Sequence, residues 1–310
     1  MLRFILKRLA YAVVTLFLIA TATFFLVAGA PGDPISAKVG QMPDQAREII
    51  SAKYGFDKPV FQRYLIYMKR LITTGDFGES IIYTGRTAND VIKENTLISA
   101  KIGLIALAFQ ATIGISLGLV SALNRGKPVD HFIRVSVVLA ICIPSFVFAA
   151  LLQYFLAFKW KLVPIYGWGK PINYVLPVAA YAIGGIASYT KYMRNSTLLV
   201  SSEDYIVTAK AKGCSKVRIV GKHILRNALT PIVTMIGPAI AGVFGGSFVI
   251  ENMYSIPGLG SYYMSAVTDN DYTMVIGLTI FFAILFVGSL ILVDILYGIV
   301  DPRIRVAKSK

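Results

Sequence analysis

Long uncharged runs dominate this sequence, and they restrict the fold more than any other feature. The chain is 56% hydrophobic with a mean hydropathy of +0.66. A bilayer core of about 30 Å is crossed by about 20 helical residues, and backbone groups in lipid must satisfy their hydrogen bonds internally. The sequence therefore predicts an all-α integral membrane protein with six transmembrane helices. The six runs are Leu9–Ala30, Ser99–Leu123, Phe132–Phe158, Val175–Met193, Pro231–Ile250 and Tyr272–Val300.

The first run follows a basic N-terminus. Arg3, Lys7 and Arg8 precede it, and signal peptides share this pattern with first membrane spans. The run is too long for a signal peptide, and Pro31 directly after its small-residue end disfavours cleavage. We therefore expect residues 1–30 to be a cytoplasmic N-terminus followed by an uncleaved first transmembrane helix.

Residues 31–97 are the only substantial region outside the predicted spans. The sequence Pro31–Pro34 breaks the helix where it leaves the membrane. Two helices are expected, at about Pro43–Tyr54 and Val60–Thr73, with a turn at Gly75–Gly78. The region is nearly neutral, and its Gly, Pro and Asp residues are typical of turns.

The charges of the loops indicate the topology. If the termini, the 124–131 loop and residues 201–230 are cytoplasmic, the cytoplasmic segments hold four acidic and 18 basic residues, counting Arg134, Lys191 and Arg194 at the ends of the spans. The loops on the other side hold 13 basic and 11 acidic residues. This asymmetry predicts six spans with both termini inside. The net charge of +15 is then explained by topology and by attraction to anionic lipid, and no nucleic-acid partner is expected.

Residues 201–230, here called the polar segment, form the only long polar stretch in the C-terminal two-thirds of the chain. They hold six basic residues and two acidic ones. A short helix is expected at Tyr205–Lys212, with Ser201 or Ser202 as its N-cap. Gly213 should end this helix in the left-handed conformation.

A second short helix is expected after Ser215, running to about Leu225. In the first helix Ile206, Ala209 and Gly213 share one face by their spacing. A face this small lets the backbone of another protein come close. The alternative is a basic amphipathic loop that lies on anionic lipid.

Small and polar residues inside the spans indicate helix packing. Gly114–Gly118 and Gly242–Gly246 have the spacing that allows close helix crossings, and widening of a translocation path is the alternative role. Gln110, Gln153 and Ser247 are expected to form hydrogen bonds between helices.

No enzyme site is recognisable. The chain has no Gly-x-x-x-x-Gly-Lys-Ser/Thr phosphate loop, and His131 and His223 lie far from any recognisable nucleophile motif. Cys142 and Cys214 have no spacing for a disulfide or a metal site. We therefore expect no catalytic residue, metal or cofactor in this chain.

The polar segment resembles the cytoplasmic coupling loop of bacterial ABC-importer permeases. The residues that carry this resemblance are Asp204–Ile206, Ala209–Gly213, Leu225–Leu229 and Pro231. The general importer loop begins Glu-Ala-Ala where this chain has Val207–Ala209, and Arg226 replaces a proline that often closes the loop. The dipeptide/oligopeptide permease family shares both departures, so the chain most resembles the B-type subunit of that family.

Three further blocks are similar to the same family, so the resemblance covers essentially the whole chain. They are Tyr54–Pro59, Gly75–Ser80 and Glu251–Gly260, with weaker matches at Asp271–Tyr272 and Asp301–Arg303.

The resemblance implies roles for two groups of residues. The coupling loop of this family seats in a cleft of an ATP-binding subunit, and the residues implied here are Asp204, Tyr205, Ala209, Ala211, Lys212 and Gly213. The external subdomain and the outer mouth of the last two spans can receive the substrate-binding protein. Glu251, Pro257, Gly258 and Gly260 are the outer-mouth residues, and a tight connection between two spans is the alternative.

The resemblance also implies an organisation. It is the ABC importer type I permease fold, with residues 1–30 as the first helix, 31–97 outside, 98–300 as helices two to six, and 301–310 as a cytoplasmic tail. The expected function is half of a path for peptides across the bacterial cell membrane. Expected partners are a second permease subunit, one or two ATP-binding subunits that hold ATP and Mg²⁺, an external binding protein and membrane lipids. A secondary transporter or a membrane enzyme would need intramembrane charges, an inverted repeat or a catalytic cluster.

Overall fold

The described part of the chain is mainly helical. A computed structural model describes residues 2–30, 44–245 and 247–300. These residues contain no β-strand, and their one isolated β-bridge joins Glu79 to Thr87. The expected helix break at Pro31–Pro34 and the tail at 301–310 lie outside the described residues.

The helices divide into two compact units, each described here by itself. The first unit is formed by residues 1–100, 244–252 and 257–310, and the second by residues 101–243 and 253–256.

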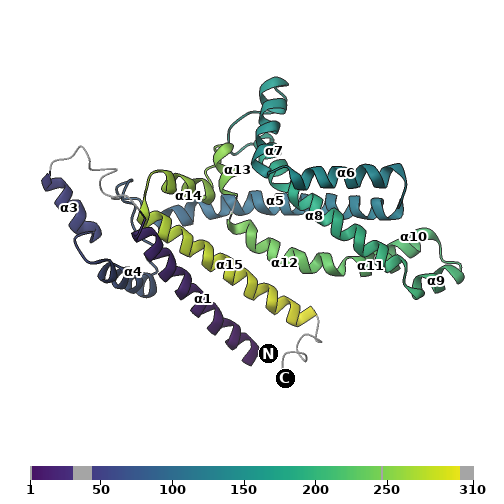
Figure 1. Ribbon diagram of the computed structural model, residues 1–310, viewed down its shortest axis with the longest axis horizontal. Helices are drawn as coiled ribbons and strands as arrows, with labels where there is room; N and C mark the ends of the chain where they lie inside the picture. Colours follow the sequence, from purple (N-terminus) through teal and green to yellow (C-terminus); the bar gives the residue numbers. More distant parts are fainter. Residues whose placement is uncertain (1, 31–43, 246, 301–310) are drawn as a thin grey trace. The chain divides into compact units, whose positions relative to one another are not determined.

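In the first unit, the N-terminal and C-terminal helices lie side by side (Figure 1). Their shared core also includes α4 and consists of Ala20, Phe24, Tyr64, Met68, Ile276 and Ile280. The Tyr64 hydroxyl lies 2.8 Å from the Thr21 hydroxyl, which fixes α4 against α1. The helices of this unit are α1 (Leu2–Ala28), α3 (Asp44–Tyr54), α4 (Val60–Thr74), the start of α5 (Ala88–Leu123), most of α13 (Phe248–Met253), α14 (Leu259–Thr268) and α15 (Tyr272–Val300).

The two helices predicted in the external region are present. α3 and α4 end within one residue of the expected positions. Gly75 follows α4 with φ 64°, and its N–H donates to the Leu71 carbonyl. Glycine takes this left-handed conformation without the strain that a side chain would cause, so the predicted turn is confirmed.

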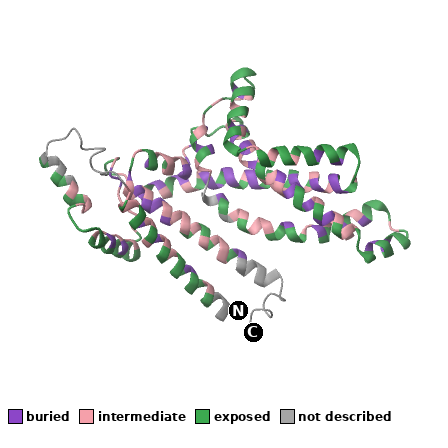
Figure 2. Cartoon of the chain, viewed as in Figure 1, coloured by how far each residue is buried: buried purple, intermediate pink, exposed green. Residues whose placement is uncertain are grey.

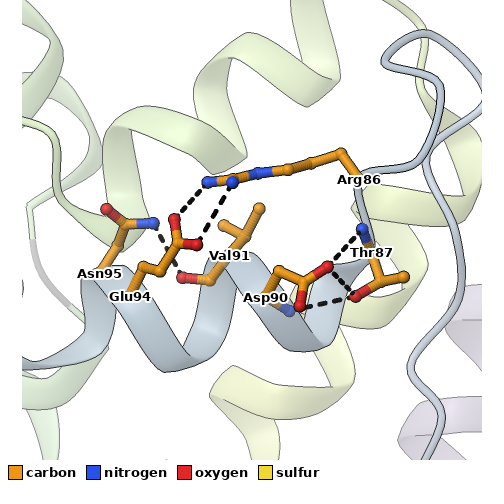
Figure 3. A network of polar contacts seen from close by, with 6 residues as sticks. All are labelled: Arg86, Thr87, Asp90, Val91, Glu94 and Asn95. Atoms are coloured by element: carbon orange, nitrogen blue, oxygen red, sulfur yellow. Dashed lines mark hydrogen bonds and ion pairs between the residues drawn. The ribbon is translucent and has the colours of Figure 1, made fainter.

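The long helix α5 begins well before the predicted span, and Figure 3 shows why. Thr87 and Asp90 cap its first turn: the Thr87 N–H and hydroxyl donate to Asp90, and the Asp90 N–H donates to the Thr87 hydroxyl at 3.1 Å. The Arg86 guanidinium reaches along the helix to both oxygens of Glu94. Ser99, the predicted start of the span, therefore lies in the fourth turn of an existing helix.

The second unit is built around α8, against which α6 and α7 pack. Its elements are the rest of α5, α6 (Pro128–Cys142), α7 (Ser145–Leu152), the π-helix η1 (Gln153–Lys159), the 3₁₀-helix η2 (Pro171–Tyr174), α8 (Val175–Ser201), α9 (Asp204–Ala211), α10 (Lys216–Arg218), the π-helix η3 (Ile219–Ile224), α11 (Leu225–Ala228) and α12 (Thr230–Gly245). Two predicted interhelical bonds are confirmed: the Gln110 amide donates to the Tyr181 carbonyl at 3.2 Å and the Gln153 amide to the Met253 carbonyl at 3.0 Å.

The prediction of one continuous third span is wrong. α6 ends at Cys142, and the chain bends by 103° before the helical stretch Ser145–Lys159. Pro144 explains the break, because proline disfavours the helical conformation of the residue before it, and Ile143 is extended at φ −83°, ψ 118°.

The fifth predicted span is also interrupted. α12 contains Pro238 and ends at Gly245, and α13 begins at Phe248. Only Thr230–Ile240 qualifies here as an apolar helix, and it is shorter than a full span. The predicted continuous helix Pro231–Ile250 is therefore wrong.

Four helices in the described ranges are long and apolar enough to cross a membrane, and the bent α6–η1 pair makes five if it is counted as one span. Large apolar side chains lie on the outside of these helices, as the exposed positions along α1 and α6 in Figure 2 illustrate. Val13 is 66% exposed and Phe132 73% exposed. Lipid is as apolar as these side chains, so the pattern is that of a multi-pass membrane protein.

One of the two predicted glycine crossings is confirmed. A Cβ atom on Gly114 would lie 2.5 Å from the Tyr189 Cβ, and one on Gly118 would lie 2.6 Å from the Met193 Cβ, so α5 and α8 are in backbone contact. A Cβ on Gly242 would meet nothing within 4 Å, and residue 246 lies outside the described residues.

Candidate functional site

The polar segment begins with α9, but its N-cap differs from the prediction. Glu203 occupies the N-cap position without a side-chain hydrogen bond to the helix. The hydroxyls of Ser201 and Ser202 instead donate backwards, to the carbonyls of Thr197 at 2.6 Å and Leu199 at 2.8 Å. Both serines therefore complete the end of α8, and the predicted N-cap is wrong.

The end of α9 agrees with the prediction at Gly213. This residue has φ 72°, and its N–H donates to the Lys210 carbonyl at 3.0 Å. The Cys214 N–H donates to the Ala209 carbonyl at 3.2 Å. This pair of bonds is the Schellman motif, which requires a left-handed residue after the helix.

The second helical part is present and longer than predicted. The Ser215 hydroxyl accepts from the Arg218 N–H at 3.4 Å, so Ser215 is the predicted cap. The helix then widens into the π-helix η3 and returns to α-helix in α11, ending at Ala228. π-helical turns within helices are rare and often occur at functional sites.

The small face of α9 packs against the chain itself. Ile206 is 0% exposed and Ala209 7% exposed, and they form one apolar cluster with Ile219 and Ile224 of η3. The prediction that this face meets the backbone of another protein is therefore wrong for Ile206 and Ala209. Of the three residues on that face, only Gly213 is exposed.

The opposite side of the polar segment is its accessible surface. Tyr205 is 40% exposed, Val207 59% and Val217 84%. All six basic residues of the segment are exposed as well: Lys210, Lys212, Lys216, Arg218, Lys222 and Arg226. Apolar contacts within a polar rim are typical of protein interfaces. Val207 and Val217 were not among the predicted site residues, although their positions off the Ile206–Ala209 face were the signal.

A side-chain hydrogen bond joins the two ends of the polar segment. The Asn227 amide donates to the Tyr205 hydroxyl at 2.7 Å and to the His223 carbonyl at 3.1 Å. Together with the apolar cluster of Ile206, this bond makes α9, η3 and α11 one compact body (Figure 1).

Glu251 of the first unit binds the backbone of the same unit at the end of the segment 251–260. This carboxylate is 1% exposed and accepts from the N–H groups of Gly260 at 2.8 Å and Ser261 at 3.2 Å. These N–H groups lie at the start of α14, where the helix dipole favours an anion. Burial raises the pKa of Glu251, and the hydrogen bonds from Ser99 and the backbone oppose that shift.

The glycines of this segment let its backbone come close to Glu251. A Cβ on Gly258 would collide with the Glu251 carboxylate, and one on Gly260 would lie 2.9 Å from it. The Ser99 hydroxyl accepts from the Leu259 N–H at 2.8 Å and so ties α5 to the same turn.

The predicted docking role of this segment therefore needs a correction. Glu251, Gly258 and Gly260 are buried within the chain, and Pro257 is only half-buried. The buried three do not offer side chains to a docked protein. Asn252 and Ser255 are the exposed residues of the segment.

Two further buried acids were not singled out as site residues. Asp271 accepts from the Ser80 hydroxyl and from the N–H groups of Ile81 and Met274, both at 3.2 Å, so it caps α15 and holds the turn after α4. Asp130 forms a buried ion pair with Arg194. An acid at the start of a helix was the available signal: Asp271 directly precedes α15, and Asp130 lies in the first turn of α6.

Within the described part of the chain, no group of three or more His, Cys, Asp or Glu residues could hold a metal ion. The arrangement is therefore that of two structural segments joined to membrane helices, with an accessible surface on the polar segment.

Two protein families match most of the chain. Residues 114–306 match the family described as the binding-protein-dependent transport system inner membrane component, and residues 1–84 match the N-terminal region of such membrane components.

Individual relatives match over nearly every residue. The dipeptide transport system permease protein of Bacillus subtilis is 38% identical over 309 residues, which cover 100% of both chains. The oligopeptide transport system permease protein of Haemophilus influenzae is 39% identical over 307 residues, covering 98% of this chain and 100% of the relative. The dipeptide transport system permease protein of Lactococcus lactis is 38% identical over 305 residues, with the same coverage.

Proposed function

This chain belongs to the family of inner membrane components of binding-protein-dependent transport systems, and we propose that it forms half of the translocation path of an ATP-driven peptide importer. The relatives that match over their full lengths are named as dipeptide and oligopeptide transport system permease proteins. These names support peptides as the transported class. The other half of the path is a second permease subunit.

The observation that carries the proposal is the exposed surface of the polar segment. Its fold is closed internally by Ile206 and by the Tyr205–Asn227 bond, so its outward valines are not needed for its own core. Val217 is 84% exposed in the short helix α10, outside the apolar helices. We propose that this surface seats in an ATP-binding subunit, which holds ATP and Mg²⁺, and that this chain catalyses no reaction.

The proposed orientation places both termini and the polar segment in the cytoplasm. Residues 31–97 then lie outside the cell membrane, where an external binding protein delivers the substrate. The excess of basic residues in the proposed cytoplasmic loops supports this orientation. ATP binding would move the polar segment as a rigid body and shift the helices between outward-open and inward-open states.

The experiment is reconstitution of the complete transporter in proteoliposomes. An affinity-tagged chain should copurify with an ATP-binding subunit, and labelled di- or oligopeptides should enter only with ATP and the binding protein. Uptake driven by an ion gradient without any ATPase would instead support a secondary transporter. A copurified ATPase with import of a different solute would refute the peptide assignment alone.

A further inference from the structure

A buried ion pair in the second unit joins two membrane helices near the polar segment. Arg194 of α8 donates to both carboxylate oxygens of Asp130, from Nε at 2.8 Å and from Nη2 at 2.9 Å. Asp130 is 1% exposed, and the Arg194 side chain is 17% exposed. A bidentate arginine–carboxylate pair fixes both distance and orientation.

The carboxylate of Asp130 also holds the connection between α5 and α6. It accepts from the Ser121 hydroxyl at 2.6 Å, near the end of α5, and from the Gly126 N–H at 3.0 Å, in the turn. Asp130 lies in the first turn of α6, where a negative charge is favoured. One side chain thus ties α5, the turn, α6 and α8 together.

The close contacts between α5 and α8 extend as far as Arg194, the arginine of the ion pair. A Cβ on Gly118 would lie 2.6 Å from the Thr190 carbonyl oxygen and 3.0 Å from the backbone nitrogen of Arg194. α6 also packs along α8 (Figure 1). The ion pair therefore closes one end of a three-helix body.

The helix that carries Arg194 leads directly into the polar segment. Six residues after Arg194, Val200 packs against the cluster of Ile206 and Ile219. Six residues of α-helix span about 9 Å, less than two turns. Only Ser202 and Glu203 separate α8 from α9, and the Glu203 N–H donates to the Val200 carbonyl at 3.3 Å.

We propose that the Asp130–Arg194 pair is the positioning link through which movement of the polar segment is passed to α5 and α6. The proposal rests on the coupling function proposed above. Without the pair, α8 still receives the movement, but the α5–α6 turn is no longer held to it. A purely apolar contact would join the helices with less directional constraint, because a bidentate pair accepts one geometry.

The first test measures coupling in the complete transporter in lipid nanodiscs and proteoliposomes. Asp130→Asn and Arg194→Lys should keep the ATPase bound and active, while the peptide imported per ATP hydrolysed falls about tenfold, within the usual range of coupling between sites. Arg134→Gln and Lys191→Gln are matched controls, because they remove an exposed charge from the same turns of α6 and α8 and should keep the wild-type ratio. A wild-type ratio in Asp130→Asn would overturn the proposal.

The second test leaves the Asp130–Arg194 pair unchanged. It therefore tests the proposal even when the variants of the first test do not assemble. Spin labels replace Val135 of α6 and Thr208 of α9, both exposed, after Cys142 and Cys214 are changed to Ser. The distance between the labels in the complete transporter should be the same without nucleotide and with bound ATP, because the two elements move together. A nucleotide-dependent distance would overturn the link. Loss of ATP-driven import in the wild type would instead refute the proposed function.

Discussion

The Asn227 amide donates to the Tyr205 hydroxyl at 2.7 Å and so joins the last helix of the polar segment to its first. The two residues are 22 positions apart in the chain. The Ile206 cluster packs beside them, so the segment has its own small core and its own closing bond. A body of this kind can transmit a push from a partner without unfolding, which a flexible basic loop does not do.

Gly213 is the residue on which the shape of this segment depends most. Gly213→Val should strain the turn by roughly 1–2 kcal/mol, because φ 72° is left-handed and disfavoured for a residue with a branched Cβ. Membrane insertion should be normal, since the spans do not use this turn. Transport should fall sharply, and the ATP-binding subunit should dissociate or hydrolyse ATP without import.

Gly221→Val is the matched control for that variant. Gly221 lies in the same segment, lacks a positive φ, and has open space around a new Cβ. It should retain most of the transport. Equal transport in both variants, with the ATPase still bound, would contradict a coupling role for the Gly213 turn and favour simple lipid attachment.

Glu251 should stabilise the folded chain through the hydrogen bonds that its carboxylate accepts from the backbone at the start of α14. Glu251→Ala leaves the buried N–H of Gly260 and the part-buried N–H of Ser261 without their acceptor, which costs about 1–3 kcal/mol. Glu94→Ala breaks an exposed ion pair and should cost about 0–1 kcal/mol. Thermal unfolding of the two variants in detergent compares them, and equal midpoints would refute the bracing role of Glu251.

The crossing of α5 and α8 should tolerate no added methyl group. Gly118→Ala places a Cβ 2.6 Å from both the Met193 Cβ and the Thr190 carbonyl oxygen, and overpacking of this kind costs about 1–3 kcal/mol. Gly242→Ala adds the same atom where nothing lies within 4 Å. Folded yield after purification should drop for Gly118→Ala alone. A normal yield of that variant would show that the helices are farther apart than described.

Single cysteines test the orientation in intact cells. In a chain whose own cysteines are replaced, Thr73→Cys should react with a membrane-impermeant maleimide, because α4 is proposed to lie outside. Lys127→Cys should react only after the cells are permeabilised, because the 124–131 loop is proposed to be cytoplasmic. Both positions are exposed, so access by the reagent depends on the membrane alone. The reverse pattern would invert the topology.

Local features of this fold were predictable from the sequence. The end of α9 at Gly213, the cap at Ser215 and the limits of α15 depend on neighbouring residues, and the structure confirms them. Hydropathy located the spans but did not show their breaks. Pro144 carried that information inside an apolar run.

Contacts between distant parts of the chain were not predictable. The spacing of Ile206 and Ala209 showed that they share a face, but it did not show that η3 covers it. The partner of Asp130 is 64 residues away, and Ser80 is 191 residues from Asp271. Such pairs depend on helix packing in three dimensions, which periodicity along one helix does not specify.

Photo-crosslinking from position 217 tests the central claim most directly. A photoreactive amino acid replaces Val217, whose side chain is 84% exposed on the polar segment, and Val135 on α6 provides a control of similar character in a membrane helix. In whole membranes, the label at 217 should form one protein crosslink, to an ATP-binding subunit, and ATP binding should change its yield. Crosslinks from 217 to lipid alone, with none to an ATPase, would contradict the account.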